Sequence, residues 1–543
     1  MNYFFLRIFS FWRILPTLTF VVFVSPLVIV LLSLTGDYSD NWTHLYNFVL
    51  GDYITNSILL VLGVGLISLI IGTSSAWIIT KYDFFGRRIL EWALILPLAI
   101  PPYILAYTFT GLFDDYGSAN EFIRWIFNLD SSFVFFPNVR NIFGAIIVFA
   151  FTLYPYIYLI SRAAFLNQSK TLTDAGRILG LGGYRIFINL GLPMIRPAVI
   201  AGLMLVIMET LSDFGAVDHF AIQTFTTGIF RTWYGMYDLH TAMQLASLLL
   251  LFIIVFLVLE RSSRMNAAYN SPVSNANSSS SEKLNGSKSF LCFIGCFIPI
   301  FIGFILPIIE LSRWAFAYNT GFFNESFFIQ AKNTILIALM ASIVCTVIAF
   351  TINFSVRHTN VIFLKRINPF LSVGYGVPGL ILAVGIVQMF TYLDKGIFIG
   401  FDFVLTGSLF GLLLAYLIKS YALSNSTIES GFERLSNRLD DSARVLKSSG
   451  WNLLLRVHFP LMKTSLLTSI LLVMSEVVKE LPATLILRPF NFDTLAVSTY
   501  IYAAEERMFE AASPAIAIVV IGLIPIIILT RMIKDSKDTP YLK

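Results

Sequence analysis

Charged residues are scarce in this chain of 543 residues. Asp, Glu, Lys and Arg make up 13% of it, hydrophobic residues make up 57%, and the mean hydropathy is +0.78. Soluble domains carry about 25% charged residues, so a soluble protein of this composition would lack polar side chains to cover its surface. Runs that are apolar on every face, such as residues 245–259, exclude barrel strands, which alternate in polarity. The composition predicts an all-α polytopic membrane protein.

Cysteine and the motifs of enzymes are also rare or missing. The three cysteines, Cys292, Cys296 and Cys345, all lie in apolar stretches, and the five histidines are scattered. We therefore expect packing residues and no certain metal site. The chain has no HExxH motif and no G-x-x-x-x-G-K-[ST] phosphate loop. A membrane enzyme is disfavoured, no cofactor is expected on this chain, and ATP would have to be used by a separate subunit.

Twelve apolar segments are long enough to cross a bilayer, which needs about 20 helical residues. Between the sixth and seventh, residues 266–288 are rich in Ser and Asn and predict a flexible cytoplasmic linker. The linker divides the chain into a first half, residues 1–265, and a second half, residues 289–543. The first segment is too long for a signal peptide and is interpreted as a retained span. The expected spans are 13–34, 54–80, 89–110, 142–163, 197–217, 241–260, 289–312, 331–354, 370–393, 405–425, 464–484 and 513–532.

The distribution of Lys and Arg predicts the orientation. Of the 37 basic residues, 28 lie in the termini and every second loop, and 9 lie on the other side. Because basic residues gather on the cytoplasmic side, both termini are expected in the cytoplasm.

The two halves repeat each other when they are aligned in one constant frame. This frame pairs acidic, arginine, glycine and proline positions, which hydrophobicity alone does not explain. Since each half has an even number of spans, the sequence predicts two parallel six-helix repeats. The paired positions include Asp174 with Asp441, Arg177 with Arg444, Gly183 with Gly450, Pro193 with Pro460, Arg196 with Lys463, Glu209 with Glu476 and Asp213 with Glu480.

Two loops on the expected cytoplasmic side, residues 171–193 and 438–460, carry the best-matched part of the repeat. Each is expected to form two short helices around a turn, with an acid at the positive end of the first helix dipole and a proline that stops the second. The expected helices span residues 174–179, 184–190, 441–446 and 451–457.

These loops resemble the E-A-A, three residues, G, nine residues, I-x-L-P motif of permeases in binding-protein-dependent ABC importers. Both copies have Asp for Glu, and Lys447 stands for the turn glycine. The resemblance implies a type I importer permease in a bacterial inner membrane, with each loop docked on one of two ATPase subunits that use ATP and Mg²⁺, and a periplasmic binding protein outside. The residues expected to couple the subunits are Asp174, Ala175, Gly176, Arg177, Gly180, Pro193, Asp441, Ser442, Ala443, Arg444, Lys447 and Pro460.

Four acids stand in the fifth and eleventh expected spans: Glu209, Asp213, Glu476 and Glu480. The two acids of each span are one helical turn apart, on one face. Because a charge in the membrane costs at least ~2.5–3.5 kcal/mol, these acids need partners. They either line a cation pathway or brace helices through Lys479 or Arg231 or by being protonated, and the residues do not decide between the two. The tyrosines at 154, 156 and 158 are a weaker pathway signal.

Residues 96–109, 209–236 and 479–500 resemble segments of fused ferric-iron permeases, and the resemblance extends over essentially the whole chain. It implies import of Fe(III), which favours oxygen ligands. A thiamine or other small-solute ABC permease of the same architecture is the alternative. A secondary transporter is disfavoured because such folds often use inverted repeats. No nucleic-acid partner is expected.

Overall fold

The computed structural model describes residues 11–130, 132–168, 176–265, 282–317, 324–397, 399–400 and 404–538. This part of the chain is almost entirely helical. Seven of its helices are long and apolar enough to cross a membrane, and four further pairs of helices pass the same test as bent spans. Helix α21, Leu409–Glu433, stands at the tenth expected span and completes the set; its polar residues, among them Lys419 and Asn425, reduce its hydropathy. The all-α architecture with about twelve spans is confirmed.

The first half contains the following elements: α2 (Phe11–Leu32), η1 (Ser33–Thr35), α3 (Asp40–His44), η2 (Leu45–Val49), α4 (Leu50–Lys81), β1 (Tyr82–Asp83), α5 (Arg87–Ala93), η3 (Leu96–Ala99), α6 (Pro102–Phe113), α7 (Ser118–Phe127), α8 (Ile142–Leu166), α10 (Gly183–Ile186), η4 (Phe187–Gly191), α11 (Leu192–Met194), α12 (Arg196–Ser212), α13 (Gly215–His219), α14 (Phe225–Tyr234) and α15 (Leu239–Met265).

The second half contains the following elements: β2 (Glu282–Lys283), α16 (Ser287–Ile300), η5 (Phe301–Ile305), α17 (Leu306–Ala317), α18 (Glu325–Thr359), α19 (Ile362–Leu371), η6 (Ser372–Gly376), α20 (Gly379–Lys395), α21 (Leu409–Glu433), α22 (Asn437–Val445), α23 (Trp451–Leu453), η7 (Leu454–His458), α24 (Phe459–Leu461), α25 (Lys463–Lys479), α26 (Pro482–Leu487), α27 (Leu495–Ala504) and α28 (Met508–Asp538).

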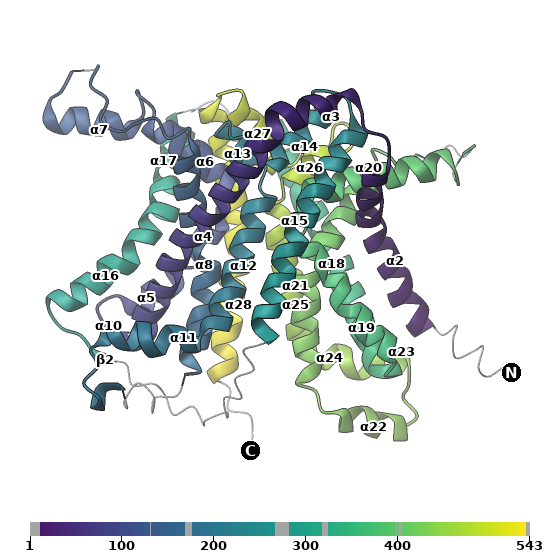
Figure 1. The fold of residues 1–543 in the computed structure, drawn as a ribbon. Coiled ribbons are helices and arrows are strands. Elements are labelled where there is room, and N and C mark those ends of the chain that lie inside the picture. Colours follow the sequence, from purple (N-terminus) through teal and green to yellow (C-terminus); the bar gives the residue numbers. More distant parts are fainter. Residues whose placement is uncertain are drawn as a thin grey trace.

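The sequence repeat is also a structural repeat. In the frame that aligns the two halves, helices α12 and α25 begin and end at paired positions, and so do the π-helical segments η4 and η7. The elements α10, α11, α22, α23 and α24 all lie at one end of the helix bundle, together with the start of α2 and the end of α28 (Figure 1).

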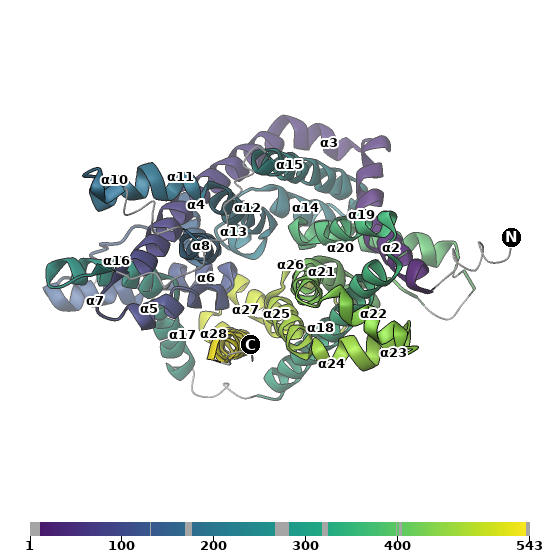
Figure 2. The same ribbon diagram turned by 90° about the horizontal axis from the view of Figure 1, so that it is seen from below.

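The first helix of each half packs against the opposite half. Helix α2 lies beside α18, α19 and α20 (Figure 2), and the ring centroids of Trp12 and Phe354 are 4.8 Å apart. Helices α16 and α17 instead contact α4, α5 and α6, with Trp314 stacked on Tyr107 at 6.4 Å. The two sequence halves are therefore interlocked in space.

Small residues let the central helices approach closely. In a membrane the hydrophobic effect does not drive helices together, so their association depends on close packing of this kind. A Cβ added to Gly72 of α4 would lie 2.8 Å from Cβ of Ile157 in α8, and one on Gly202 of α12 would lie 2.9 Å from Cα of the same isoleucine. Helices α4, α8 and α12 therefore depend on these two glycines for their packing.

Four expected spans are broken, contrary to their prediction as continuous helices. The third bends by 92° at Pro101–Pro102, and the ninth bends by 111° near Pro378. Proline lacks the amide donor of a continuous helix and restricts the preceding residue. The fifth and eleventh spans end at Ser212 and Lys479 instead of 217 and 484, because the next residues adopt extended backbone angles.

Residues 266–281 of the expected linker lie outside the described part of the chain. The residues that follow pair with the first half: Glu282–Lys283 forms a parallel two-residue sheet with Tyr82–Asp83, and α16 begins at Ser287.

Candidate functional site: an acid-lined cavity and two elbows

We call residues 176–194 the first elbow. Residues 176–178 are helical, the chain turns at Gly180 with φ of +77°, and a second helix runs from Gly183 to Met194. Arg177 forms an ion pair of 2.5 Å with Glu282 at the end of the expected linker. Of the expected coupling residues, Asp174 and Ala175 lie outside the described residues.

We call residues 437–461 the second elbow. Its first helix, α22, begins at Asn437, ahead of the expected start at residue 441, because the side chain of Ser436 caps it by accepting a hydrogen bond from the amide of Arg438. Lys447 occupies the position of Gly180 and has φ of +60°, a left-handed conformation that is strained for a residue with a Cβ. The substitution of glycine thus leaves the turn geometry intact.

The second helices of the elbows end four residues later than predicted, at 194 and 461 instead of 190 and 457. The second helices end at Met194 and Leu461, just after Pro193 and Pro460, and the chain then bends by 77° and 79° into α12 and α25. Each proline lies two residues after the end of a π-helical segment.

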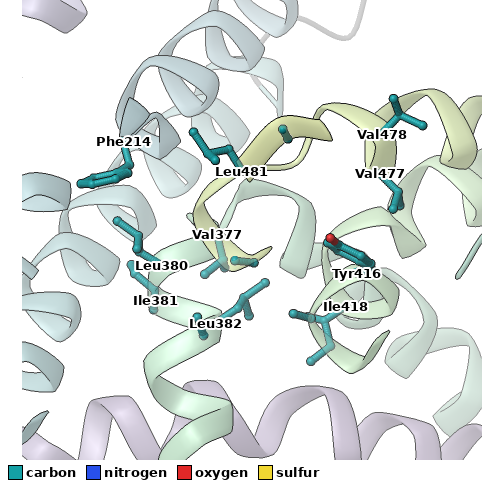
Figure 3. Close-up of a cluster of buried hydrophobic side chains, with 14 of the residues drawn as sticks. Phe214, Val377, Leu380, Ile381, Leu382, Tyr416, Ile418, Val477, Val478 and Leu481 are labelled. Carbon is teal, nitrogen blue, oxygen red and sulfur yellow. The ribbon is translucent and has the colours of Figure 1, made fainter. Parts of the chain in front are cut away.

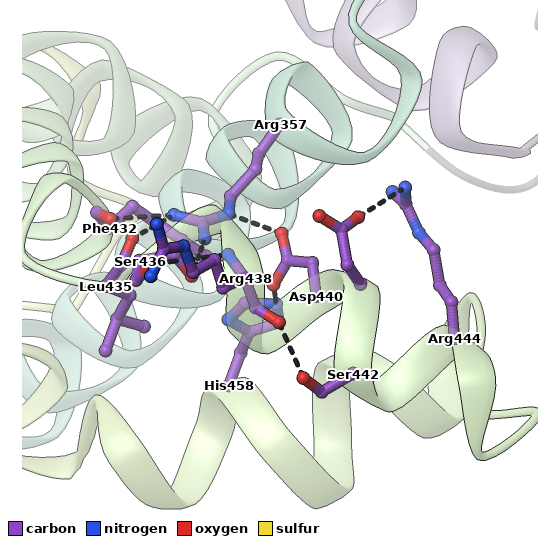
Figure 4. A network of polar contacts seen from close by, with 10 residues as sticks. Arg357, Phe432, Leu435, Ser436, Arg438, Asp440, Ser442, Arg444 and His458 are labelled. Carbon is purple, nitrogen blue, oxygen red and sulfur yellow. Dashed lines mark hydrogen bonds and ion pairs between the residues drawn. The ribbon is translucent and has the colours of Figure 1, made fainter.

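A polar cluster anchors the second elbow to α18 (Figure 4). The guanidinium of Arg357 donates from Nε to Asp440 at 2.7 Å, and its other nitrogens donate to the carbonyl oxygens of Phe432, Leu435 and Ser436. On the opposite side of Asp440, Nε2 of buried His458 lies 3.0 Å from Oδ1. In the first elbow, Gly191 stands at the position of His458, so the two elbows differ in how they are held.

Each elbow exposes a pair of apolar side chains at its turn. Ile178 and Leu179 are 86% and 79% exposed, and Val445 and Leu446, at the duplicated positions, are 82% and 81% exposed. Large apolar side chains exposed at matching places mark a surface suited to protein contact.

The four acids in the fifth and eleventh spans come together. Glu209, Asp213, Glu476 and Glu480 line one cavity of about 70 Å³. The breaks in four spans surround this cavity, because Leu98 and Pro101 of the third span also line it, and Tyr375 of the ninth lies beside Glu209 and Glu476. Discontinuous helices at ion and substrate sites are a recurrent feature of transporters.

Asp213 and Glu480 stand at the helix breaks, two residues before the short helices α13 and α26. Asp213 accepts a hydrogen bond of 2.8 Å from the amide of Ala216, and Glu480 accepts one of 3.3 Å from Ala483. The expectation that each acid pair shares one helical face is corrected here, because the second acid of each pair lies beyond the helix end. Phe214 and Leu481, which follow these acids, are buried in an apolar cluster with Leu380 (Figure 3).

Two lysines pair with the acids of the second half. Lys479 lies 3.2 Å from Glu476, as the bracing interpretation predicted, and Lys419 forms an ion pair with Glu480. Arg231 instead pairs with Asp218 at 3.8 Å. Sequence reasoning missed Lys419; its signal is a single charge within the apolar run of α21, where a charge needs a partner. Two of the four acids are thus braced by lysines, and the interpretation of the acids as a cation pathway stays a prediction.

The three tyrosines of α8 separate. Tyr156 lines the acid cavity, whereas Tyr158 donates to the carbonyl oxygen of Glu91 at 2.8 Å and Tyr154 is buried in a separate apolar cluster. Tyr156 is therefore the member of this set that faces the acid cavity.

A second cavity of about 140 Å³ adjoins the first, and Tyr103 and Gly215 line both. Its other lining residues include Arg140, Asp218, His219, Tyr500 and Glu506. Here the charges are paired: Arg140 lies 3.3 Å from Glu506, and Tyr500 donates to Asp218 at 2.7 Å.

No preformed metal site is present among the described residues, because no three His, Cys, Asp or Glu side chains converge closely enough to hold an ion. Within the same part of the chain, Cys292, Cys296 and Cys345 are free thiols, consistent with their expected role in packing. The carboxylate oxygens that line the acid cavity therefore do not converge closely enough to form a metal site in this structure.

Comparisons with known proteins agree with this architecture. The Fe(3+)-transport system permease protein FbpB 2 of Haemophilus influenzae is 24% identical over 89% of this chain and 90% of its own length. The putative ferric transport system permease protein FbpB 1 of the same organism is 21% identical over 77% of this chain and 67% of its own length. The putative molybdenum transport system permease protein YvgM of Bacillus subtilis is 27% identical over 31% of this chain and 73% of its own length.

The family sequence model matches twice, once in each half, over residues 68–262 and 346–535. These two matches cover most of the chain, and they contain both elbows and all four acids of the cavity. The protein is a multi-pass permease subunit and belongs to the family of binding-protein-dependent transport system inner membrane components.

Proposed function

We propose that this chain is the translocation subunit of an ATP-driven importer of ferric iron. The observation that carries the proposal is the composition of the shared cavity. Four carboxyl groups face two lysines there, so two of the acids have no lysine of their own and are available to bind a cation. Carboxylate and phenolate oxygens are the ligands that hard Fe(III) prefers, and Tyr103 and Tyr156 border the same space. The two ferric permeases that align with most of this chain support the same cargo.

The alternative cargoes differ in how they fit the cavity. Relatives named for molybdenum and sulfate match about a third of this chain, and an oxyanion entering the cavity would meet more acids than lysines. Thiamine is itself a cation, so the charge of the cavity does not separate it from iron. The two ferric permeases that align with most of this chain favour iron.

Coupling to ATP hydrolysis is assigned to the loops at residues 171–193 and 438–460. The exposed apolar pairs at the turns, the twofold repeat of the elbows and the steep bends into α12 and α25 support this role. Helices α12 and α25 each start beside an elbow and end next to an acid of the cavity, Asp213 or Glu480. A movement of an elbow would therefore be transmitted to the cavity by one rigid helix. Two ATPase subunits would each hold one loop and use ATP and Mg²⁺, while a periplasmic binding protein would deliver the ion at the opposite face.

The coupling contacts are proposed to involve Asp174, Ala175, Gly176, Arg177, Gly180, Pro193, Asp441, Ser442, Ala443, Arg444, Lys447 and Pro460. The excess of Lys and Arg on the elbow side supports a cytoplasmic position for the elbows and for both termini. We also propose that residues 1–265 and 289–543 are the two functional halves, joined by the linker at 266–288.

Transport assays with the assembled importer test the cargo. We expect ATP-dependent uptake of labelled Fe(III) but not of labelled thiamine or molybdate. Glu209→Gln should reduce iron uptake by roughly tenfold or more, because it removes a carboxylate group that would bind the ion. The matched control is Glu325→Gln, an exposed acid at the start of α18, which should transport normally. Thiamine uptake in place of iron, or iron uptake that survives vanadate and collapses with an ionophore, would contradict the proposal.

Pull-down of the ATPase subunit tests the elbows. Ile178→Asp and Val445→Asp place a charge on the exposed apolar pairs and should each weaken ATPase binding by roughly tenfold, since a charge in an apolar contact must be desolvated. Iron binding in the cavity should be unaffected. Unchanged ATPase binding by both variants would remove the docking role of these turns.

A further inference from the structure

The duplication of the chain is broken at two positions that face the acid cavity. Lys419 corresponds to Thr152, and Lys479 corresponds to Ser212, in the same frame that pairs the acids of the two halves. All four of these residues line the cavity. The carboxylates are thus present in both halves, whereas the lysines are present in the second half alone.

The lysines engage the acids of their own half. Lys419 is 7% exposed and pairs with Glu480, which is 6% exposed. Lys479 pairs with Glu476. Among the described residues, Glu209 and Asp213 of the first half form no ion pair with a lysine or arginine. The first half therefore offers carboxylates that a cation can reach, while in the second half lysines occupy the equivalent groups.

The hydroxyl of Tyr103 is a second, independent sign of a ligand at this place. Tyr103 is 5% exposed, and its hydroxyl has no hydrogen-bond partner in the described part of the chain, although buried hydroxyls are nearly always paired. It lines both the acid cavity and the adjoining one. The unused hydroxyl lies at the junction through which an ion would pass toward Glu209 and Asp213.

We propose that Lys419 and Lys479 are tethered counter-cations that hold the second half's carboxylates until the transported cation displaces them. This inference rests on the proposed cation pathway and extends it. The arriving ion is received by Tyr103, Glu209 and Asp213, and the carboxylates of Glu476 and Glu480 join it as the lysines withdraw. When the elbows move, the lysines return to their carboxylates and expel the ion toward the other side.

Electrostatic repulsion prevents a metal ion and a lysine ammonium group from binding the same carboxylate at once. A metal ion bound to a carboxylate that is also bonded to an ammonium group brings two positive charges close together in a buried site, where water screens them poorly. Lys479 has another acceptor at hand, because its Nζ lies 3.4 Å from the carbonyl oxygen of Leu98 at the break of the third span. The lysine can therefore leave Glu476 without losing every polar contact.

The proposal is tested by measuring Tb(III) binding to the purified full chain in lipid nanodiscs. Tb(III) is a hard trivalent ion, and nearby tyrosines sensitise its luminescence. Lys419→Thr and Lys479→Ser copy the residues of the first half. If the lysine-free state is a minor one in the wild type, each variant should bind Tb(III) roughly tenfold tighter, and iron uptake should fall because release is slower. Lys419→Arg keeps the charge and should retain the wild-type affinity. Lys479 is partly exposed, so Lys479→Ser carries the test if Lys419→Thr does not fold.

The outcomes separate this proposal from the cation pathway itself. Unchanged or weaker Tb(III) binding in both lysine variants, with a signal that Glu209→Gln still removes, would overturn the tethered lysines and leave the pathway in place. Equal tightening by Lys419→Arg and Lys419→Thr would show that packing, not charge, is responsible, and would also overturn it. A signal that Glu209→Gln does not change would instead refute the cation pathway on which the proposal rests.

Discussion

The anchor of the second elbow allows a prediction whose size follows from the structure. Replacing Arg357 by Met retains the aliphatic stem but removes the hydrogen bonds to Asp440 and to three carbonyl oxygens. The side chains of Arg357 and Asp440 are 14% and 8% exposed, so the buried Asp440 would lose its arginine partner and keep only the imidazole of His458 beside it. Removing one partner of a buried ion pair costs about 3–5 kcal/mol.

Hydrogen exchange of the full chain in nanodiscs measures this cost locally. Since about 1.4 kcal/mol is a factor of ten, amides of α22 should exchange roughly 100- to 4,000-fold faster in Arg357→Met, because local opening becomes more frequent. Amides of the first elbow, where Gly191 stands at the position of His458, should be unchanged. Iron uptake should fall with the loss of a fixed docking surface for the ATPase.

The matched control lies on the same elbow. Arg444 pairs with Asp441 at 3.7 Å, and their side chains are 46% and 72% exposed, so Arg444→Met should change the local stability by less than about 1 kcal/mol. Exchange in α22 that is equally slow in Arg357→Met and in the wild type would refute the anchoring argument. Equal acceleration by both variants would show that general loss of charge, rather than the buried pair, holds the helix.

Further predictions concern the glycine positions. Gly180→Val should abolish uptake without preventing membrane insertion, because φ of +77° strains a β-branched residue; Gly182→Ala, with ordinary backbone angles and open space around it, should transport normally. Lys447→Gly should stabilise the second elbow by about 1 kcal/mol, seen as slower hydrogen exchange there, and faster exchange would contradict the strain at φ of +60°. Gly72→Val should lower the stability of the chain by about 1–3 kcal/mol, because its first added carbon would lie 2.8 Å from the facing isoleucine of α8. A thermal unfolding assay in detergent that shows no loss of stability would refute this packing argument.

The amino-acid sequence by itself determined the class of protein, the approximate positions of its spans, the parallel duplication and the two elbows. These features depend on local properties that the sequence displays directly: apolar runs long enough for a bilayer, the side on which Lys and Arg gather, and glycine, proline and acidic residues in one frame. The turn at Lys447 illustrates the limit, because its left-handed backbone follows from the repeat and not from the preference of lysine.

Only the tertiary structure decided which residues meet. Glu209 and Glu476 belong to opposite halves of the sequence yet line one cavity. The pair of Lys419 with Glu480 was not expected, because the sequence of α21 does not identify which acid Lys419 contacts. Likewise, the exchange of α2 and α16 between the halves and the breaks in four spans depend on how helices pack around prolines and small residues. The sequence shows that a charge in an apolar helix needs a partner, but the packing of helices distant in the sequence determines which residue that partner is.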